Sequence, residues 1–171
     1  MTELRRRLAQ SHLLRRTFIP IFSHVNPGNI TIRHHWTGEP ITVHAFRHKD
    51  YWYYAKRREQ ATMTLCARLI CSGDVVFDVG GHMGYVALYF VQLVGREGRV
   101  FSFEPSPGNL PYIRANLSQA RYGNALFVEK AAGATGGSAT FWAEDLTGQN
   151  GSIIPSYYEN VAATARSHGV R

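Results

Sequence analysis

Residues 73–85 read Gly-Asp-Val-Val-Phe-Asp-Val-Gly-Gly-His-Met-Gly-Tyr, and this stretch decides the fold class. Its first part, residues 75–79, is a nearly continuous apolar run, which is typical of a strand buried on both faces of a parallel sheet. A glycine-rich turn follows, and residues 85–94 then carry apolar side chains at helical spacing. The stretch therefore predicts a strand, a tight turn and a helix, in that order.

The same alternation extends on both sides of this stretch. Apolar runs and helical spacing predict strands over 99–103, 125–129 and 138–142 and helices over 57–71 and 107–119. Two β-rich runs, 30–32 and 41–46, predict an antiparallel hairpin before them. Strands that alternate with helices predict an α/β fold with a Rossmann-like, doubly wound, mostly parallel sheet, here preceded by the hairpin.

The turn between the first strand and its helix predicts a ligand site. Parallel sheets bind ligands at the carboxyl ends of their strands, and glycine lets a ligand approach the backbone closely. Glu104 ends the next strand, 20 residues after Gly84, so its carboxylate is expected beside the same crevice, where it can accept hydrogen bonds from a ribose diol. Because a carboxylate at a strand end is expected to face the crevice, we expect the Glu104 side chain to contribute little to the packing of the fold. The pattern predicts a site for an adenosine-containing cofactor.

The spacing of the turn glycines favours one such cofactor over the others. Gly80-x-x-x-Gly84 is not the G-x-G-x-x-G of a dinucleotide site, and Asp78 would repel a pyrophosphate. S-adenosyl-L-methionine fits better, because its sulfonium is positively charged and the expected site holds acidic residues with no Lys or Arg nearby. A nicotinamide-dependent oxidoreductase is the alternative enzyme class. His82 is interpreted as an ordinary turn residue, with a general base at the helix start as the alternative.

The run from Gly73 to Tyr85, followed by Phe103-Glu104-Pro105-Ser106-Pro107, resembles the FkbM family of S-adenosyl-L-methionine-dependent methyltransferases over about residues 59–152. The resemblance implies the class I methyltransferase fold and methylation of a hydroxyl on a small-molecule or sugar acceptor. It also implies the cofactor-binding residues: Asp78, Gly80 and Gly84 at the methionine end, Glu104 at the ribose, Pro105 and Ser106 beside the adenine, and Asn109 and Glu59.

The chain also departs from the family pattern. The family commonly has Ala-Asn-Ile where this chain has Gly81-His82-Met83, and its later Lys-x-Asp-x-Glu-Gly motif does not occur here. The resemblance therefore implies a partial, truncated methyltransferase domain over 29–171, with a cofactor-binding core at about 73–132, and an inactive fragment is one alternative. We expect self-association through an uncovered sheet edge, and weak turnover.

Charge is concentrated at the N-terminus. Residues 1–60 hold 11 Lys and Arg against 4 Asp and Glu, whereas the rest of the chain is neutral. We expect a solvated basic arm over 1–28. Because this arm has no interleaved aromatic residues, it gives no strong signal for nucleic-acid binding. An RNA- or membrane-binding module on a degenerate Rossmann core remains the non-enzyme alternative. No run is long enough to span a membrane, and no secretion signal is evident, so we expect a cytoplasmic protein.

The remaining candidates are interpreted as structural. Cys66 and Cys71 are five apart, which suits neither zinc nor a redox pair, so we expect small buried thiols. The histidines at 34, 35, 44 and 48 lack a nearby Cys or spaced acid, so surface positions are expected and no metal site is predicted. The aromatic cluster at 51–54 is expected to pack a domain edge, with stacking on a substrate ring as its alternative.

Overall fold

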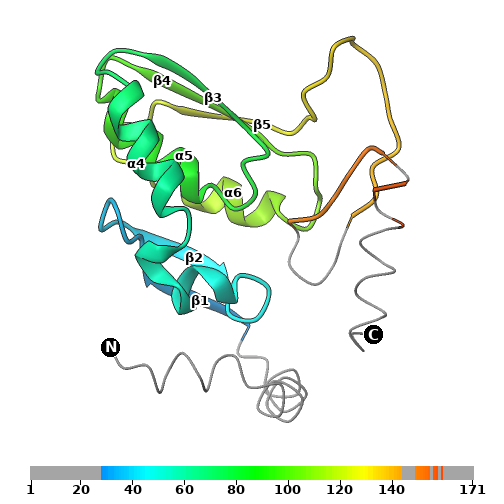
Figure 1. The fold of residues 1–171 in the computed structure, drawn as a ribbon, viewed down its shortest axis with the longest axis horizontal. Helices are drawn as coiled ribbons and strands as arrows, with labels where there is room; N and C mark the ends of the chain where they lie inside the picture. The colour runs from blue at the N-terminus through cyan, green and yellow to red at the C-terminus, as the bar shows by residue number, and fades with distance from the viewer. Residues whose placement is uncertain (1–27, 144–148, 155, 158, 160–171) are drawn as a thin grey trace.

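The computed structural model describes residues 28–143, 149–154, 156–157 and 159, and these residues form three layers (Figure 1). A parallel sheet lies on top, helices lie beneath it, and a two-stranded antiparallel hairpin lies below the helices. The sheet holds β3 (Val75–Val79), β4 (Arg99–Phe103) and β5 (Ala125–Val128), in that order. The helices are α4 (Gln60–Leu69), α5 (Tyr85–Val94) and α6 (Leu110–Leu117). The hairpin is β1 (Asn29–Arg33) and β2 (Pro40–His44), followed by α3 (Lys49–Tyr53) and a 3-10 turn over Ala55–Arg57.

The α/β class, the parallel sheet and the preceding hairpin are confirmed. Phe77 lies opposite Phe101, and Phe101 lies opposite Leu126, so the three strands are in parallel register. The helix α5 forms the centre of the core, because seven of its ten residues are buried. That burial explains why α5 is apolar on nearly every side rather than along one stripe.

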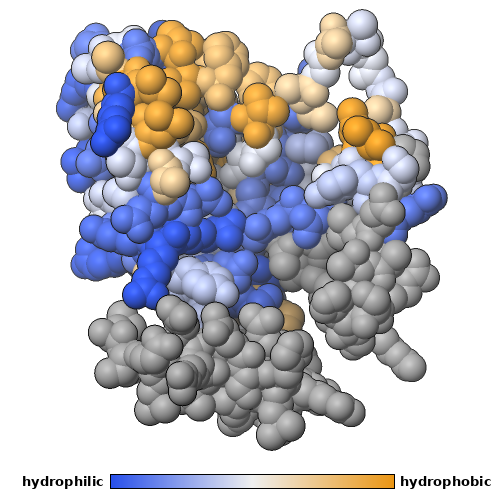
Figure 2. All heavy atoms as spheres, viewed as in Figure 1, coloured by the Kyte–Doolittle hydropathy of each residue, from blue (hydrophilic) through white to orange (hydrophobic). Residues whose placement is uncertain are grey.

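The described helices cover one face of the sheet. On that face Val100 and Ser102 are fully buried, whereas Val75, Phe77 and Val79 on the other face are 56–64% exposed. The expectation that residues 75–79 are buried on both sides is therefore wrong for the described residues, since no described helix packs on the second face. Figure 2 shows apolar side chains gathered over the upper part of the molecule, where Figure 1 places the sheet and α4.

Buried polar side chains fix the hairpin to the helices. The Asn116 side chain on α6 accepts a hydrogen bond from the Thr42 N–H and donates to the carbonyls of Thr42 and Met83. The His34 Nε2 donates to the Tyr85 carbonyl at 2.8 Å, while its Nδ1 accepts from the N–H groups of the turn that follows β1. These bonds place the hairpin against α6 and the start of α5.

Two expectations about single side chains are wrong. His34 and His48 are buried rather than on the surface, because each ring satisfies backbone groups of a turn. Burial holds the pKa of His34 at about 4 and, with His82 as a further cause, that of His48 at about 3. Cys71 is exposed and Cys66 is half-buried, so the two cysteines are not the buried thiols expected.

Several boundaries also differ from the prediction. The helix expected over 57–71 begins only at Gln60, because Glu59 adopts a left-handed conformation with φ of 57°. The helix expected over 107–119 spans Leu110–Leu117. The strand expected over 138–142 is an isolated bridge between Trp142 and Ser152, since the glycine-rich segment before it offers few side chains to pack. The basic arm expected over 1–28 lies, apart from Gly28, outside the described residues.

Candidate functional site

A cavity of about 570 Å3 lies where β3 and β4 end at their carboxyl termini. Its volume is within the range of about 300–1,000 Å3 that is usual for small-molecule sites. It is lined by α3 and the segment that leads into α4, by the end of β3 with the glycine turn and the start of α5, by the end of β4, and by described residues that follow β5. The lining residues are Tyr51, Arg58, Glu59, Asp78–His82, Tyr85, Val86, Phe103–Pro105, Ala131, Ala132, Phe141, Gln149 and Gly151–Ile153.

The glycine turn is held in an unusual backbone conformation. Gly80, His82 and Gly84 have φ values of +87°, +52° and +84°, a region that favours glycine. The Gly80 and Gly81 N–H groups both donate to the Phe103 carbonyl at 2.9 Å, which fixes the turn to the end of β4. A Cβ at Gly80 would meet nothing within 4 Å, so at this point the cavity wall is bare backbone that a ligand can approach.

Glu104 ties the turn to the loop after β4. Its Oε2 accepts from the His82 N–H at 2.8 Å, and its Oε1 accepts from the Ser106 N–H at 2.8 Å and from the Asn109 amide at 3.2 Å. The residue is only 5% exposed, although it lines the cavity. The expectation that Glu104 supports little packing is therefore wrong, because three donors of the surrounding loops depend on its carboxylate.

Asp78 lies in the cavity wall next to the turn. Its Oδ2 accepts a hydrogen bond from the Ser102 hydroxyl at 2.8 Å, and the residue is 8% exposed. Burial raises the pKa of Asp78, the Ser102 hydrogen bond opposes the rise, and the charge of Glu104 adds to it. Two acids thus lie at the ends of neighbouring strands, which gives this part of the cavity negative character.

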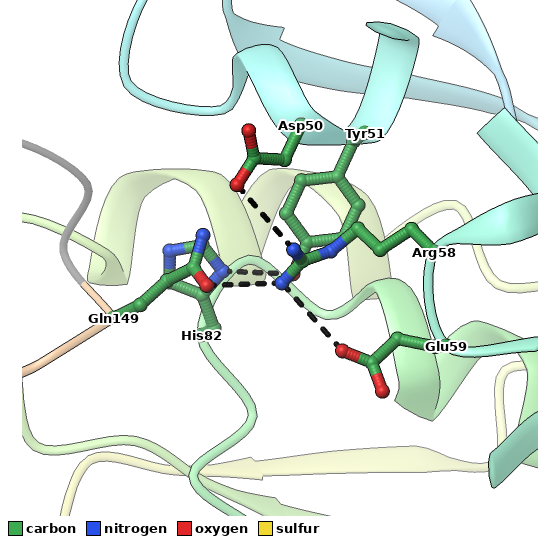
Figure 3. Close-up of polar contacts among 6 residues, drawn as sticks. All are labelled: Asp50, Tyr51, Arg58, Glu59, His82 and Gln149. Atoms are coloured by element: carbon green, nitrogen blue, oxygen red, sulfur yellow. Dashed lines mark hydrogen bonds and ion pairs between the residues drawn. The ribbon is translucent and has the colours of Figure 1, made fainter. Parts of the chain in front are cut away.

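A group of polar side chains, here called the Arg58 cluster, lies at another part of the cavity, and all of its members except Asp50 line the wall (Figure 3). The cluster is Asp50, Tyr51, Arg58, Glu59, His82 and Gln149. The Arg58 guanidinium lies 4.1 Å from the centre of the Tyr51 ring and within 3.6 Å of the carboxylates of Asp50 and Glu59. Its Nη2 also donates to the Gln149 side chain at 3.0 Å and to the Tyr51 hydroxyl at 3.3 Å. The expectation that no Lys or Arg lies near the site is therefore wrong.

His82 connects the turn with this cluster. Its Nδ1 lies 3.2 Å from the Tyr51 hydroxyl, and its ring stacks against the Tyr51 ring. His82 is thus a cavity residue with a defined aromatic and polar environment rather than only a member of a turn, and its positive φ adds local strain of the kind that occurs at functional sites.

The structure brings five of the eight predicted residues to the cavity: Glu59, Asp78, Gly80, Glu104 and Pro105. The other three lie behind the wall. Gly84 sits against Leu117 and Ile113 of α6, while Ser106 and Asn109 hold the Glu104 carboxylate. Sequence reasoning considered Tyr51 only as part of the aromatic cluster at 51–54, with stacking on a substrate ring as the alternative, and it missed Arg58. The position of Arg58 directly before Glu59 was the one signal available for it.

Comparisons with known proteins lead to methyltransferases. The chain is 41% identical over 56 residues to a protein-L-isoaspartate O-methyltransferase from Methanothrix thermoacetophila, a match that covers 33% of this chain and 27% of that protein. No protein-family model matches the chain. The chain spans about a quarter of the length of this curated relative, so the match identifies a shared segment and not a shared whole.

Solved structures give the same kind of likeness. A precorrin-6y C5,15-methyltransferase from Geobacter metallireducens is 29% identical at a TM-score of 0.38, over 44% of this chain and 39% of that one. A fibrillarin from Aeropyrum pernix, with natively bound S-adenosyl-L-methionine, is 18% identical at a TM-score of 0.37, over 62% and 42%. Both TM-scores are below 0.5, so neither likeness bears on function. The prediction of a methyltransferase that uses S-adenosyl-L-methionine agrees with the curated relative, which is itself a methyltransferase.

No helix among the described residues is long and apolar enough to cross a membrane. The same part of the chain has no group of three or more His, Cys, Asp or Glu side chains arranged to hold a metal ion.

Proposed function

We propose that this chain carries the S-adenosyl-L-methionine site of a methyltransferase that transfers a methyl group to a hydroxyl oxygen of a small metabolite or sugar, in the manner of the FkbM family. The observation that carries the proposal is the cavity at the carboxyl ends of β3 and β4, which is lined by both the bare backbone of Gly80 and Glu104. Transfer to oxygen is supported by the curated relative, which is an O-methyltransferase.

The residues of the cavity fit this cofactor. Glu104 offers carboxylate oxygens for ribose hydroxyls, Pro105 offers an apolar surface beside it, and Gly80 leaves room for the chain of the cofactor. When bound, the cofactor supplies an activated methyl group. The chain's residues bind and orient the cofactor and the hydroxyl acceptor, and this positioning is the source of most of the rate enhancement of such a transfer. The cofactor-binding core is proposed at about 73–132, within a domain over 29–171, in a cytoplasmic protein.

Calorimetric titration of the purified chain tests the proposal. S-adenosylhomocysteine should bind with measurable heat, and NAD should give none, because the turn lacks the glycine spacing that presents amides to a pyrophosphate. Heat with NAD and none with S-adenosylhomocysteine would show that the cavity serves a dinucleotide. Incubation with labelled S-adenosyl-L-methionine and a panel of hydroxylated metabolites and sugars then tests the acceptor.

A further inference from the structure

The Arg58 cluster places a cation and an anion side by side in the cavity wall. Arg58 and Glu59 are consecutive, both line the cavity, and their charged groups are 3.6 Å apart. Asp50 lies at the same distance from Arg58 on its other side, and Figure 3 shows the guanidinium between the two carboxylates. A ligand group that carries both a negative and a positive charge can pair with Arg58 and Glu59 at this part of the cavity wall.

The geometry of Arg58 is preorganised. The guanidinium is held over the Tyr51 ring at 4.1 Å, and its side chain is only 16% exposed. Tyr51 is itself buried and is fixed by the contact between its hydroxyl and His82. A guanidinium held in this way loses little entropy when it binds a carboxylate, and its fork of N–H groups suits two carboxylate oxygens.

Arg58 also retains unused binding capacity. Its Nε is buried and has no hydrogen-bond partner among the described residues, and its two ion pairs are long at 3.6 Å. A buried donor without a partner costs free energy, so an acceptor that enters the cavity and reaches Arg58 is favoured. Glu59 contributes the complementary feature: its carboxylate is partly exposed on the cavity wall, and its backbone is held in a left-handed conformation.

We propose that Arg58 and Glu59 bind the α-amino-acid end of the cofactor, with Arg58 holding the carboxylate and Glu59 the ammonium. This inference rests on the proposed function, since it names the residues that recognise one end of the same ligand. His82 of the glycine turn links the two parts of the site, because its N–H donates to Glu104 while its ring contacts Tyr51, which lies under the Arg58 guanidinium. One molecule in the cavity can therefore meet Glu104 with its ribose and the Arg58–Glu59 pair with its amino-acid end.

A comparison of two ligands tests the inference. S-adenosylhomocysteine carries the amino-acid group, whereas 5′-methylthioadenosine keeps the adenosine and the thioether but lacks it. Arg58→Ala should weaken binding of S-adenosylhomocysteine about tenfold or more, the loss expected for hydrogen bonds to a charged group, and should leave binding of methylthioadenosine unchanged. Glu59→Gln should act in the same direction on the first ligand alone.

Arg57→Ala is the matched control, because it removes the same charge from the residue directly before Arg58. Arg57 is exposed and does not line the cavity. Binding of methylthioadenosine also reports whether each variant keeps its adenosine site. Equal losses for both ligands in Arg58→Ala would assign Arg58 a purely structural role and overturn the inference, as would unchanged affinity for S-adenosylhomocysteine. If the unaltered chain bound neither ligand, the proposed function itself would fail, which is a distinguishable result.

Discussion

Glu104 combines a binding role and a structural role in one carboxylate. Glu104→Ala should weaken binding of S-adenosylhomocysteine by about 1.5–3 kcal/mol, because a charged acceptor is lost. It should also lower the free energy of unfolding by about 1–3 kcal/mol, since the N–H groups of His82 and Ser106 lose their acceptor. Calorimetry gives the first quantity and urea denaturation the second. A folded variant with unchanged affinity would remove Glu104 from the binding site.

Gly81 is coupled to Ser102 across the strand end. A Cβ at Gly81 would collide with the Ser102 Oγ and approach the Ile113 side chain. Gly81→Ala should therefore destabilise the protein by about 1–3 kcal/mol, the usual cost of overpacking. Adding Ser102→Ala removes the colliding oxygen, so the double variant should lose less stability than the two single variants together. If the stability loss of the double variant in urea denaturation equalled the sum of the two single losses, the contact between Gly81 and Ser102 would not be the cause of the destabilisation.

At the scale of elements, two buried histidines that fix the turns of the hairpin region make its stability depend on pH. His34 and His48 have pKa values of about 4 and about 3, below the ordinary value of 6.5, mainly because of burial. Groups with a depressed pKa contribute stability that is present above pH 6.5 and is lost as the pH falls through the lowered pKa. The free energy of unfolding should therefore fall as the pH is lowered from 6.5 to about 4 for His34 and to about 3 for His48.

Urea denaturation at stepped pH, with NMR titration of the imidazole signals, measures this dependence. His48→Asn keeps a side-chain oxygen that can accept from the His44 N–H, so it should show a smaller loss on acidification than the unaltered chain. A titration of His34 and His48 near pH 6.5 in the native protein would contradict the assignment.

The order of elements from β3 to β5 could be predicted because apolar runs, glycine turns and helical spacing are local signals. The ends of elements could not. Glu59 has no sequence property that reveals its left-handed backbone, and that conformation moves the start of α4 to Gln60. Nor does a run such as residues 75–79 show whether one or both faces are covered, because that depends on which helices pack on the sheet.

The same limit applies to the candidate site. Gly80 and Glu104 could be placed at neighbouring strand ends because parallel strands end at one edge of a sheet. Arg58 and Tyr51 reach the cavity through the packing of α3 and the following turn beside α5, which no spacing encodes. The burial of Glu104 also depends on donors from two different loops, so its structural role follows only from the fold.

At the scale of the whole molecule, the exposed face of the sheet should lead to self-association. Phe77 is 62% exposed and stacks on Phe101 and Phe103, so these rings form a continuous apolar surface. Light scattering should show a mass that rises with concentration, and Phe77→Lys should reduce that rise. Leu65→Lys, at an exposed apolar position on α4, is the control. A monodisperse monomer at every concentration would contradict the prediction.

The exposed Cys71 gives the molecule a natural labelling point. It precedes β3, whose five residues extend about 17 Å, and the cavity lies at the opposite end of that strand. Burial raises the pKa of the Cys66 thiol, so Cys66 has less of the reactive thiolate, and a maleimide dye added at one equivalent should attach first to Cys71. A fluorophore there would leave the cavity open, and its anisotropy or energy transfer could follow ligands and partner copies in real time.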